Sequence, residues 1–116
     1  MTDTTIKNAQ IKSTFLGRED HGIFTFYLDV CIADGGCAIG GYALDNYDET
    51  QKRRICDQKG LQLIDEIIRV VGVDSWEKLN GKYIRIKCRG RGQTVNEIGN
   101  LIDDKWLNFE NFFKKE

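Results

Sequence analysis

The sequence predicts an α+β domain in which one main helix packs on an antiparallel sheet, in the order β-β-β-α-β-β. Two patterns predict this class. Before residue 45 and after residue 81, apolar and polar residues alternate, as is typical of half-buried strands. Between these regions, apolar residues recur at helical spacing. The chain of 116 residues contains no linker or internal repeat, so we expect residues 1–116 to form a single globular domain.

Three strands are expected in the first part of the chain, at residues 6–16, 22–33 and 37–44. The second is the clearest, because β-branched and aromatic residues dominate it. Its alternation places five apolar side chains on the face that we expect at the heart of the core: Phe24, Phe26, Leu28, Val30 and Ile32. Asp34-Gly35-Gly36 predicts a tight turn, and the pair Gly40-Gly41 predicts a bulge or the close approach of another backbone or a ligand.

Helical spacing begins at about residue 49 and continues to residue 71. One apolar stripe consists of Leu61, Ile64, Ile68 and Val71, and the residues that widen it are Leu63, Ile67 and Val70. Gly60 is expected to break or kink this helix, and Gly72 fits its C-cap. A short helical turn anchored by Trp76 is expected at residues 75–79.

Two strands and a final helical turn are expected in the last part of the chain. Residues 82–88 alternate, with Ile84 and Ile86 on the inward face. Residues 95–102 fit a strand or a helix, and we favour a strand paired with 82–88 because Gly99 and two asparagines disfavour a helix. The final turn is expected to bury Phe109, Phe112 and Phe113. The expected core is Phe24, Phe26, Leu28, Val30, Ile64, Ile68, Ile84 and Ile86.

Composition excludes several classes of protein. The formal net charge of −1 argues against broad binding to duplex nucleic acid, which needs an extended basic surface. No apolar run approaches the roughly 20 residues of a membrane-spanning helix. The N-terminus carries no hydrophobic signal segment. We therefore expect a cytoplasmic protein without a membrane partner.

The cysteines do not form a metal-binding pattern. They are Cys31, Cys37, Cys56 and Cys88, and none forms a C-x-x-C pair. Together with His21 their spacing does not match a zinc ribbon or finger. We expect free, mostly buried thiols, with Cys56 on the helix, and neither a metal nor a cofactor. A regulatory disulfide is the alternative.

The main candidate site is a basic strand and the loop that follows it. The outward side chains of this segment are Tyr83, Arg85, Lys87, Arg89 and Arg91. Arginine makes bidentate contacts with phosphate, and Gly90 and Gly92 allow a turn that exposes N–H donors. The P-loop pattern is absent. The alternative is a solvated strand face whose charges protect a sheet edge.

Three further residues complete the candidate ligand site. Tyr42 follows two glycines, so little backbone bulk would prevent its ring from stacking on a planar ligand. Asn96 or Asn100 is expected to bond a ribose or a base edge. The only histidine, His21, adjoins Glu19 and Asp20, but the sequence places no nucleophile or metal beside them. We therefore expect a solvated turn there, and a protein that is not an enzyme.

Four stretches resemble a group of small phage and prophage proteins. They are Glu-Asp-His-Gly-Ile-Phe at 19–24, Gly-Gly-Tyr-Ala-Leu-Asp at 40–45, Trp-Glu-Lys-Leu-Asn-Gly-Lys-Tyr-Ile-Arg at 76–85 and Ile-Gly-Asn-Leu-Ile-Asp-Asp-Lys-Trp at 98–106. The resemblance extends over residues 11–113. It implies a phage-borne accessory gene and, by analogy with other such genes, a protein that counters host defence.

Two functions are compatible with these observations. The first is binding and sequestration of a small nucleotide-derived immune signal, of the cyclic nucleotide or cyclic ADP-ribose type, because a small polyanion needs a focused pocket and not a broad basic surface. The alternative is a protein-binding inhibitor of a host defence complex such as a CRISPR effector, with aromatic and arginine hot spots on a flat surface. We also expect a homo-oligomer, most simply a dimer, with the site at or near the subunit interface.

Overall fold

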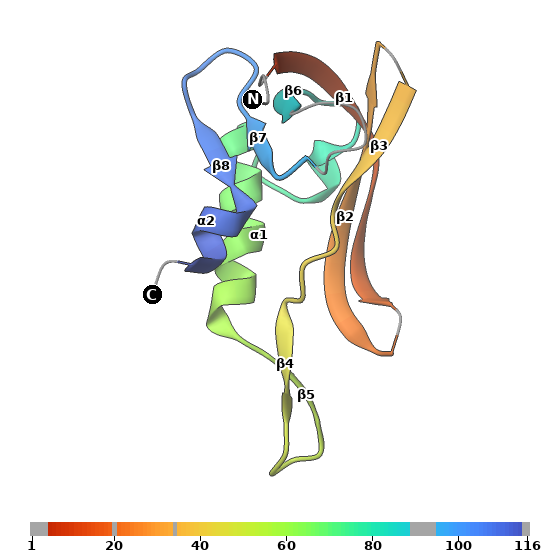
Figure 1. The fold of residues 1–116 in the computed structure, drawn as a ribbon, viewed down its shortest axis with the longest axis vertical. Helices are drawn as coiled ribbons and strands as arrows, with labels where there is room; N and C mark the ends of the chain where they lie inside the picture. Colours follow the sequence, from red (N-terminus) through yellow and green to blue (C-terminus); the bar gives the residue numbers. More distant parts are fainter. Residues whose placement is uncertain (1–4, 20, 34, 89–94, 115–116) are drawn as a thin grey trace.

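The computed structural model describes residues 5–19, 21–33, 35–88 and 95–114. It confirms the α+β class, with an antiparallel six-stranded sheet, the main helix α1 (Gln58–Val71) and a short helix α2 (Phe109–Lys114). Figure 1 shows both helices side by side against one part of the curved sheet. The sheet order is β3-β2-β1-β6-β7-β8. These strands are β1 (Thr5–Glu19), β2 (Ile23–Ile32), β3 (Gly35–Gly40), β6 (Tyr83–Cys88), β7 (Glu97–Gly99) and β8 (Trp106–Asn108).

The connection between the sheet and the main helix differs from the expectation. A hairpin of β4 (Asp45–Asp48) and β5 (Arg53–Cys56) projects from the body of the molecule (Figure 1), so Cys56 lies on a strand. The helix begins only at Gln58, because the Asp57 side chain accepts a hydrogen bond from the Gly60 N–H at 2.7 Å and caps the helix. The expected helical start at residue 49 is therefore wrong.

The strand boundaries also need correction. The third strand ends at Gly40, although residues 41–44 continue beside β2 through hydrogen bonds from Gly41 N to Phe26 O and from Leu44 N to Phe24 O, both 2.8 Å. The expected pairing of residues 95–102 with the strand at 82–88 is confirmed. The strand that the structure shows in this segment, β7, is only three residues long. The additional strand β8 was not expected. The structure does contain a 3-10 turn at Glu77–Leu79 and the final helix α2.

The core confirms the face assignment of the two clearest strands. Phe26, Leu28, Ile84 and Ile86 are fully buried, and Val30 is 3% exposed. Leu63, Ile67 and Val70 provide the buried face of α1. The expected core residues Phe24, Ile64 and Ile68 are only partly buried.

The main helix is rotated relative to the predicted stripe. The apolar face of α1 is broad enough for the helix to pack in either of two rotations about its own axis. The observed rotation leaves Leu61 73% exposed. Gly60 explains the choice, because it is buried against the chain at Leu44. A Cβ on Gly60 would lie 2.5 Å from the Leu44 carbonyl oxygen. Gly60 therefore neither breaks nor kinks the helix. Because it has no side chain, the first turn of α1 can lie close to the backbone at Leu44.

We expect Gly60→Ala to lower the free energy of unfolding by about 1–3 kcal/mol, the usual cost of overpacking. The loss should appear although alanine favours a helix over glycine by roughly 1 kcal/mol. Urea unfolding followed by circular dichroism measures it. Gln62→Ala is the matched control, because Gln62 is an exposed residue of the same helix. Equal or greater stability of Gly60→Ala would contradict the close approach to Leu44.

The cysteines are free, but they are less buried than expected. Cys31 and Cys56 are exposed, and Cys37 and Cys88 are half-buried. Cys31 is exposed because it alternates with Val30 and so points away from the core. Burial, with a smaller contribution from Cys88, raises the pKa of the Cys37 thiol. Within the described ranges, no group of three His, Cys, Asp or Glu residues is placed to hold a metal ion, and no helix is long and apolar enough to cross a membrane.

Candidate functional site

The outward side chains of β6 lie in the middle of the sheet. This strand is antiparallel to β1 on one side and to β7 on the other. Because Ile84 and Ile86 are buried, Tyr83, Arg85 and Lys87 point away from the core, as the alternation predicted. The neighbouring strands add further polar and aromatic side chains. We call this surface the outer face, and its members are Asn8, Gln10, Tyr83, Arg85, Lys87 and Trp106.

Gly99 makes room for an indole ring beside β6. It pairs with Arg85 across the β6–β7 ladder and with Trp106 across the β7–β8 ladder. A Cβ on Gly99 would lie 2.5 Å from an atom of the Trp106 ring. The ring therefore covers the backbone of Gly99 and approaches the cationic side chains of β6.

Arg85 is held in place by neutral groups. Its Nε donates to the Asn100 carbonyl oxygen at 2.7 Å, and its Nη2 donates to the Asp103 carbonyl oxygen at 2.9 Å. The guanidinium carbon lies 4.8 Å from the centre of the Trp106 ring. Within the described part of the chain, Arg85 forms no salt bridge and its Nη1 makes no hydrogen bond. Its charge is thus oriented without being neutralised by a nearby carboxylate.

Lys87 is in a different electrostatic environment. Its Nζ lies 3.1 Å from Glu97 Oε2 and 4.5 Å from the centre of the Trp106 ring. The Glu97 carboxylate is largely buried, and it also accepts a hydrogen bond from Asn108 at 3.3 Å. The charge of Lys87 is therefore compensated, and Arg85 is the stronger candidate for an anion contact.

The two asparagines of the expected site have contacts within the fold. The Asn100 side-chain amide donates to the carbonyl oxygens of Val70 and Val71 at the end of α1. Its Oδ1 accepts hydrogen bonds from the next turn of the chain, at Ile102 N and Asp103 N. Asn96 is 6% exposed, and its carbonyl oxygen accepts a hydrogen bond from Phe109 N. Asn100 therefore joins the helix to the β7–β8 turn.

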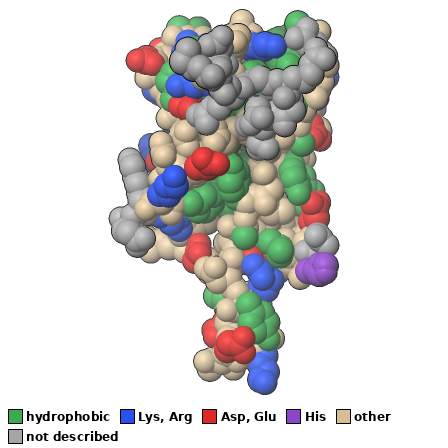
Figure 2. Space-filling view, viewed as in Figure 1, with side chains coloured by type: hydrophobic (Ala, Val, Ile, Leu, Met, Phe, Trp, Pro, Cys, Tyr) green, Lys and Arg blue, Asp and Glu red, His purple; other side chains and the backbone are tan. Residues whose placement is uncertain are grey.

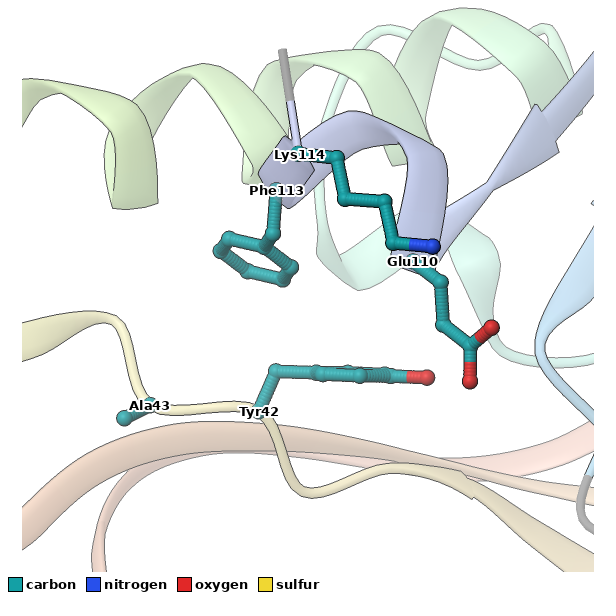
Figure 3. A pocket seen from close by; sticks show the side chains of 5 residues that line it. All are labelled: Tyr42, Ala43, Glu110, Phe113 and Lys114. Carbon is teal, nitrogen blue, oxygen red and sulfur yellow. The ribbon is translucent and has the colours of Figure 1, made fainter. Parts of the chain in front are cut away.

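Tyr42 lies on the core side of the sheet. Its ring centre lies 6.4 Å from that of Phe26, 5.3 Å from that of Phe109 and 5.4 Å from that of Phe113. An open pocket of about 530 Å³ adjoins it, and Figure 3 shows Tyr42 and Phe113 facing each other there. Burial, and then the Glu110 carboxylate, raise the pKa of the Tyr42 hydroxyl.

The expected ligand-binding residues therefore do not form one cluster. Tyr42 packs on the buried Phe26, whereas Tyr83 and Arg85 point away from the core. Figure 2 shows hydrophobic side chains gathered between α2 and β2, with charged side chains at the edge of that group. Arg89 and Arg91, with the loop between them, lie outside the described residues.

Two amide side chains of β1 belong to the outer face, although the sequence did not mark them as site residues. Asn8 pairs with Arg85 and Gln10 pairs with Tyr83. They border a hollow of about 260 Å³, whose lining consists of Asn8, Ala9, Gln10, Cys31, Ile32, Ala33 and Tyr83. The signal in the sequence was the alternation of these amides with Ala9 and Ile11, which are buried. The register that brings them beside β6 could not be read from that pattern.

The outer face combines an exposed aromatic ring, two amides and a positioned guanidinium on adjacent strands. This set is suited to an anion that carries a planar ring, because stacking, hydrogen bonding and charge act on different parts of one ligand. Comparison with protein-family models gave no matching family, and comparisons with curated proteins and with solved structures gave no match.

Proposed function

We propose that this chain is a non-catalytic binding protein that captures a small nucleotide-derived anion on its outer face. In the cell it would act as a phage-encoded anti-defence protein that sequesters an immune signal of the cyclic nucleotide or cyclic ADP-ribose type. The observation that carries the proposal is Arg85, whose guanidinium is fixed by two carbonyl oxygens and an indole ring without a carboxylate partner among the described residues.

Each part of such a ligand has a matching group. Arg85 contributes its charge and its Nη1 to a phosphate. Tyr83, which is 55% exposed, offers its ring to a base. Asn8 beside the hollow offers its amide donor and acceptor to the base edge or a ribose hydroxyl, and Gln10, whose Nε2 donates to the Gly81 carbonyl oxygen at 3.3 Å, offers its amide oxygen. A site built around one positioned cation such as Arg85 is compatible with a formal net charge of −1. A broad surface for binding a polyanion is not.

A ligand panel tests this function. The purified protein is incubated with cyclic dinucleotides, cyclic trinucleotides and cyclic ADP-ribose isomers, and the free ligand is measured after ultrafiltration. Sequestration predicts that one class is depleted and is recovered intact after heat denaturation of the protein. A chemically altered ligand would instead indicate an enzyme.

Substitution of Arg85 tests whether the ligand binds at the outer face. We expect Arg85→Gln to weaken capture of the panel ligand about 10- to 100-fold, because a hydrogen bond to a charged group contributes about 1.5–3 kcal/mol. Arg69→Gln is the matched control, since it removes the same charge from an exposed position on α1. Equilibrium dialysis measures the affinities, and thermal melting checks the fold of each variant.

Tyr83→Ala gives a second readout that does not disturb the carbonyl contacts of Arg85. Loss of base stacking should weaken binding by about 1–3 kcal/mol. Unchanged affinity in both Arg85→Gln and Tyr83→Ala would show that the ligand binds elsewhere.

One observation favours the alternative of a protein-binding inhibitor. An apolar groove of about 470 Å³ runs between the first turn of α1 and the sheet, with Leu61 73% exposed at its border. Its other apolar lining residues are Leu16, Phe24, Leu44 and Ile64. Under this alternative the protein captures no ligand of the panel. Leu61→Asp, but not Arg85→Gln, should then abolish the ability of the protein to protect a phage that infects a host carrying the defence system.

A further inference from the structure

Strand β3 forms a free edge of the six-stranded sheet. This strand is one end of the sheet order, and it reads Gly-Gly-Cys-Ala-Ile-Gly, with no charged side chain. Sheet edges are usually protected by lysine, proline, a bulge or a covering segment. The chain contains no proline, and the β2–β3 register is continuous from Ile32↔Gly35 to Tyr27↔Gly40. The described part of β3 therefore lacks the first three of these protections.

The other free edges differ from β3. The edge strand β8 is three residues long and leads directly into α2. In the two-stranded sheet, β4 carries two acidic side chains and β5 carries two basic ones. These features disfavour further strand pairing, so β3 is the edge that accepts another strand most readily.

The hydrogen-bond pattern identifies which groups of β3 point outward. Gly41 N donates to Phe26 O, which fixes the phase of the antiparallel ladder between β2 and β3. Bonded and non-bonded pairs alternate along such a ladder. The pairs Leu28↔Ile39 and Val30↔Cys37 are therefore the bonded ones. The β3 residues that alternate with Cys37 and Ile39 direct their N–H and C=O groups away from β2, and these residues are Gly36, Ala38 and Gly40.

The occupant that best fits this edge is a second copy of the same strand. The outward residues are symmetric about Ala38, so a two-fold axis there would place Ala38 opposite its own copy and Gly36 opposite Gly40 of the other copy. Each pair would exchange both of its backbone hydrogen bonds. Their side chains are hydrogen or methyl, so none obstructs the approach, and β3 brings no like charges together.

The geometry points to a symmetric dimer of this chain in which two β3 strands pair antiparallel about Ala38 and join two six-stranded sheets into one. Two strands, β2 and β1, separate β3 from β6, so in this dimer the outer face lies away from the subunit interface, where the sequence had led us to expect the site. The dimer therefore presents two separate outer faces. Its existence does not depend on the proposed function.

Measurement of the molecular mass of variants at the β3 edge tests this dimer. Light scattering of the wild-type chain at high micromolar concentration should give the mass of a dimer. Ala38→Lys, which places like charges in opposing positions, and Ala38→Pro, which removes an outward N–H, should both give the mass of a monomer at the same concentration. Ala33→Lys is the control, because Ala33 is exposed but lies outside β3.

Hydrogen exchange separates loss of pairing from loss of folding. In the wild-type chain, the amides of Gly36, Ala38 and Gly40 should exchange more slowly as the concentration rises. In Ala38→Lys they should exchange fast, while the amides of Ile39 and Cys37, which bond to β2, stay protected. A monomeric wild-type chain, or a dimer that survives both Ala38 substitutions, would overturn the proposal.

Discussion

Truncation of Phe26 to alanine is expected to lower the free energy of unfolding by about 3–5 kcal/mol. The side chain is fully buried, and its ring joins three parts of the molecule. Its centre lies 6.3 Å from that of Trp76, 5.8 Å from that of Phe109 and 6.4 Å from that of Tyr42. Removal of the ring leaves a cavity that these neighbours cannot fill without moving away from their own contacts.

Urea unfolding followed by circular dichroism measures this loss. Phe15→Ala is the matched control, because Phe15 is 40% exposed on β1. A loss under about 1 kcal/mol for Phe26→Ala, close to the average for any point substitution, would contradict the assignment of the β2 faces.

Removal of the Asp45 carboxylate is expected to have the second-largest effect on stability. Asp45 is 3% exposed. Its Oδ1 accepts hydrogen bonds from Arg54 Nε at 3.0 Å and Nη2 at 2.8 Å, and its Oδ2 accepts one from Phe24 N at 3.2 Å. Since Phe24 belongs to β2 and Arg54 to β5, the carboxylate fastens the hairpin to the sheet. We expect Asp45→Ala to lower the free energy of unfolding by about 2–3 kcal/mol.

The contribution of Asp45 should depend on pH in a defined direction. The hydrogen bond from Arg54 is the largest cause that lowers the pKa of the Asp45 carboxyl, and the Phe24 N–H and the charge of Arg18 add to it. Because the folded pKa lies below the ordinary value of about 3.9, the stabilisation is complete above that pH and is lost as the pH falls through the lower, folded pKa.

Urea unfolding measured from neutral to acidic pH tests whether the contribution of Asp45 to stability is lost in acid. The stability difference between the wild-type chain and Asp45→Ala should be constant near neutral pH and should shrink in acid. Asp74→Ala is the control, because Asp74 pairs with Lys78 at an exposed position, and little change is expected there. A difference that grows in acid would contradict the assigned role of Asp45.

The parts of the fold that could be predicted are those in which burial imposes a period. In β2 and β6 every second side chain enters the core, and the alternation of Phe26 with Tyr27 or of Ile84 with Arg85 records this directly. The rotation of α1 was not predictable in this way. Its apolar face is wide, and the close contact of Gly60 with Leu44 that selects one rotation is a tertiary contact.

The β4–β5 hairpin was missed for a related reason. Its residues are mostly polar, so no apolar alternation marks the two strands. The hairpin is held by the hydrogen bonds of Asp45 to Arg54 and to Phe24, and the latter lies 21 residues away along the chain. Such contacts leave no periodic pattern in the sequence.

The candidate site was predicted in part. The shared outward direction of Tyr83, Arg85 and Lys87 followed from the period of the strand. Their partners did not, because strand register brings Asn8 beside Arg85 and the β7–β8 ladder brings Trp106 over Gly99. The register between β6 and β7 places Glu97 against Lys87, so Lys87 forms an internal ion pair.

The most direct test of the proposed outer-face site uses the two tryptophans of the chain. Trp106 lies beside Arg85 and Lys87, whereas Trp76 packs edge-on against Phe26 in the core. The indole N–H signals of ¹⁵N-labelled protein are recorded during titration with each ligand of the nucleotide panel. The proposal predicts that a captured ligand shifts the Trp106 signal and leaves that of Trp76 unchanged. A captured ligand that leaves the Trp106 signal in place, or the absence of any captured ligand, would contradict it.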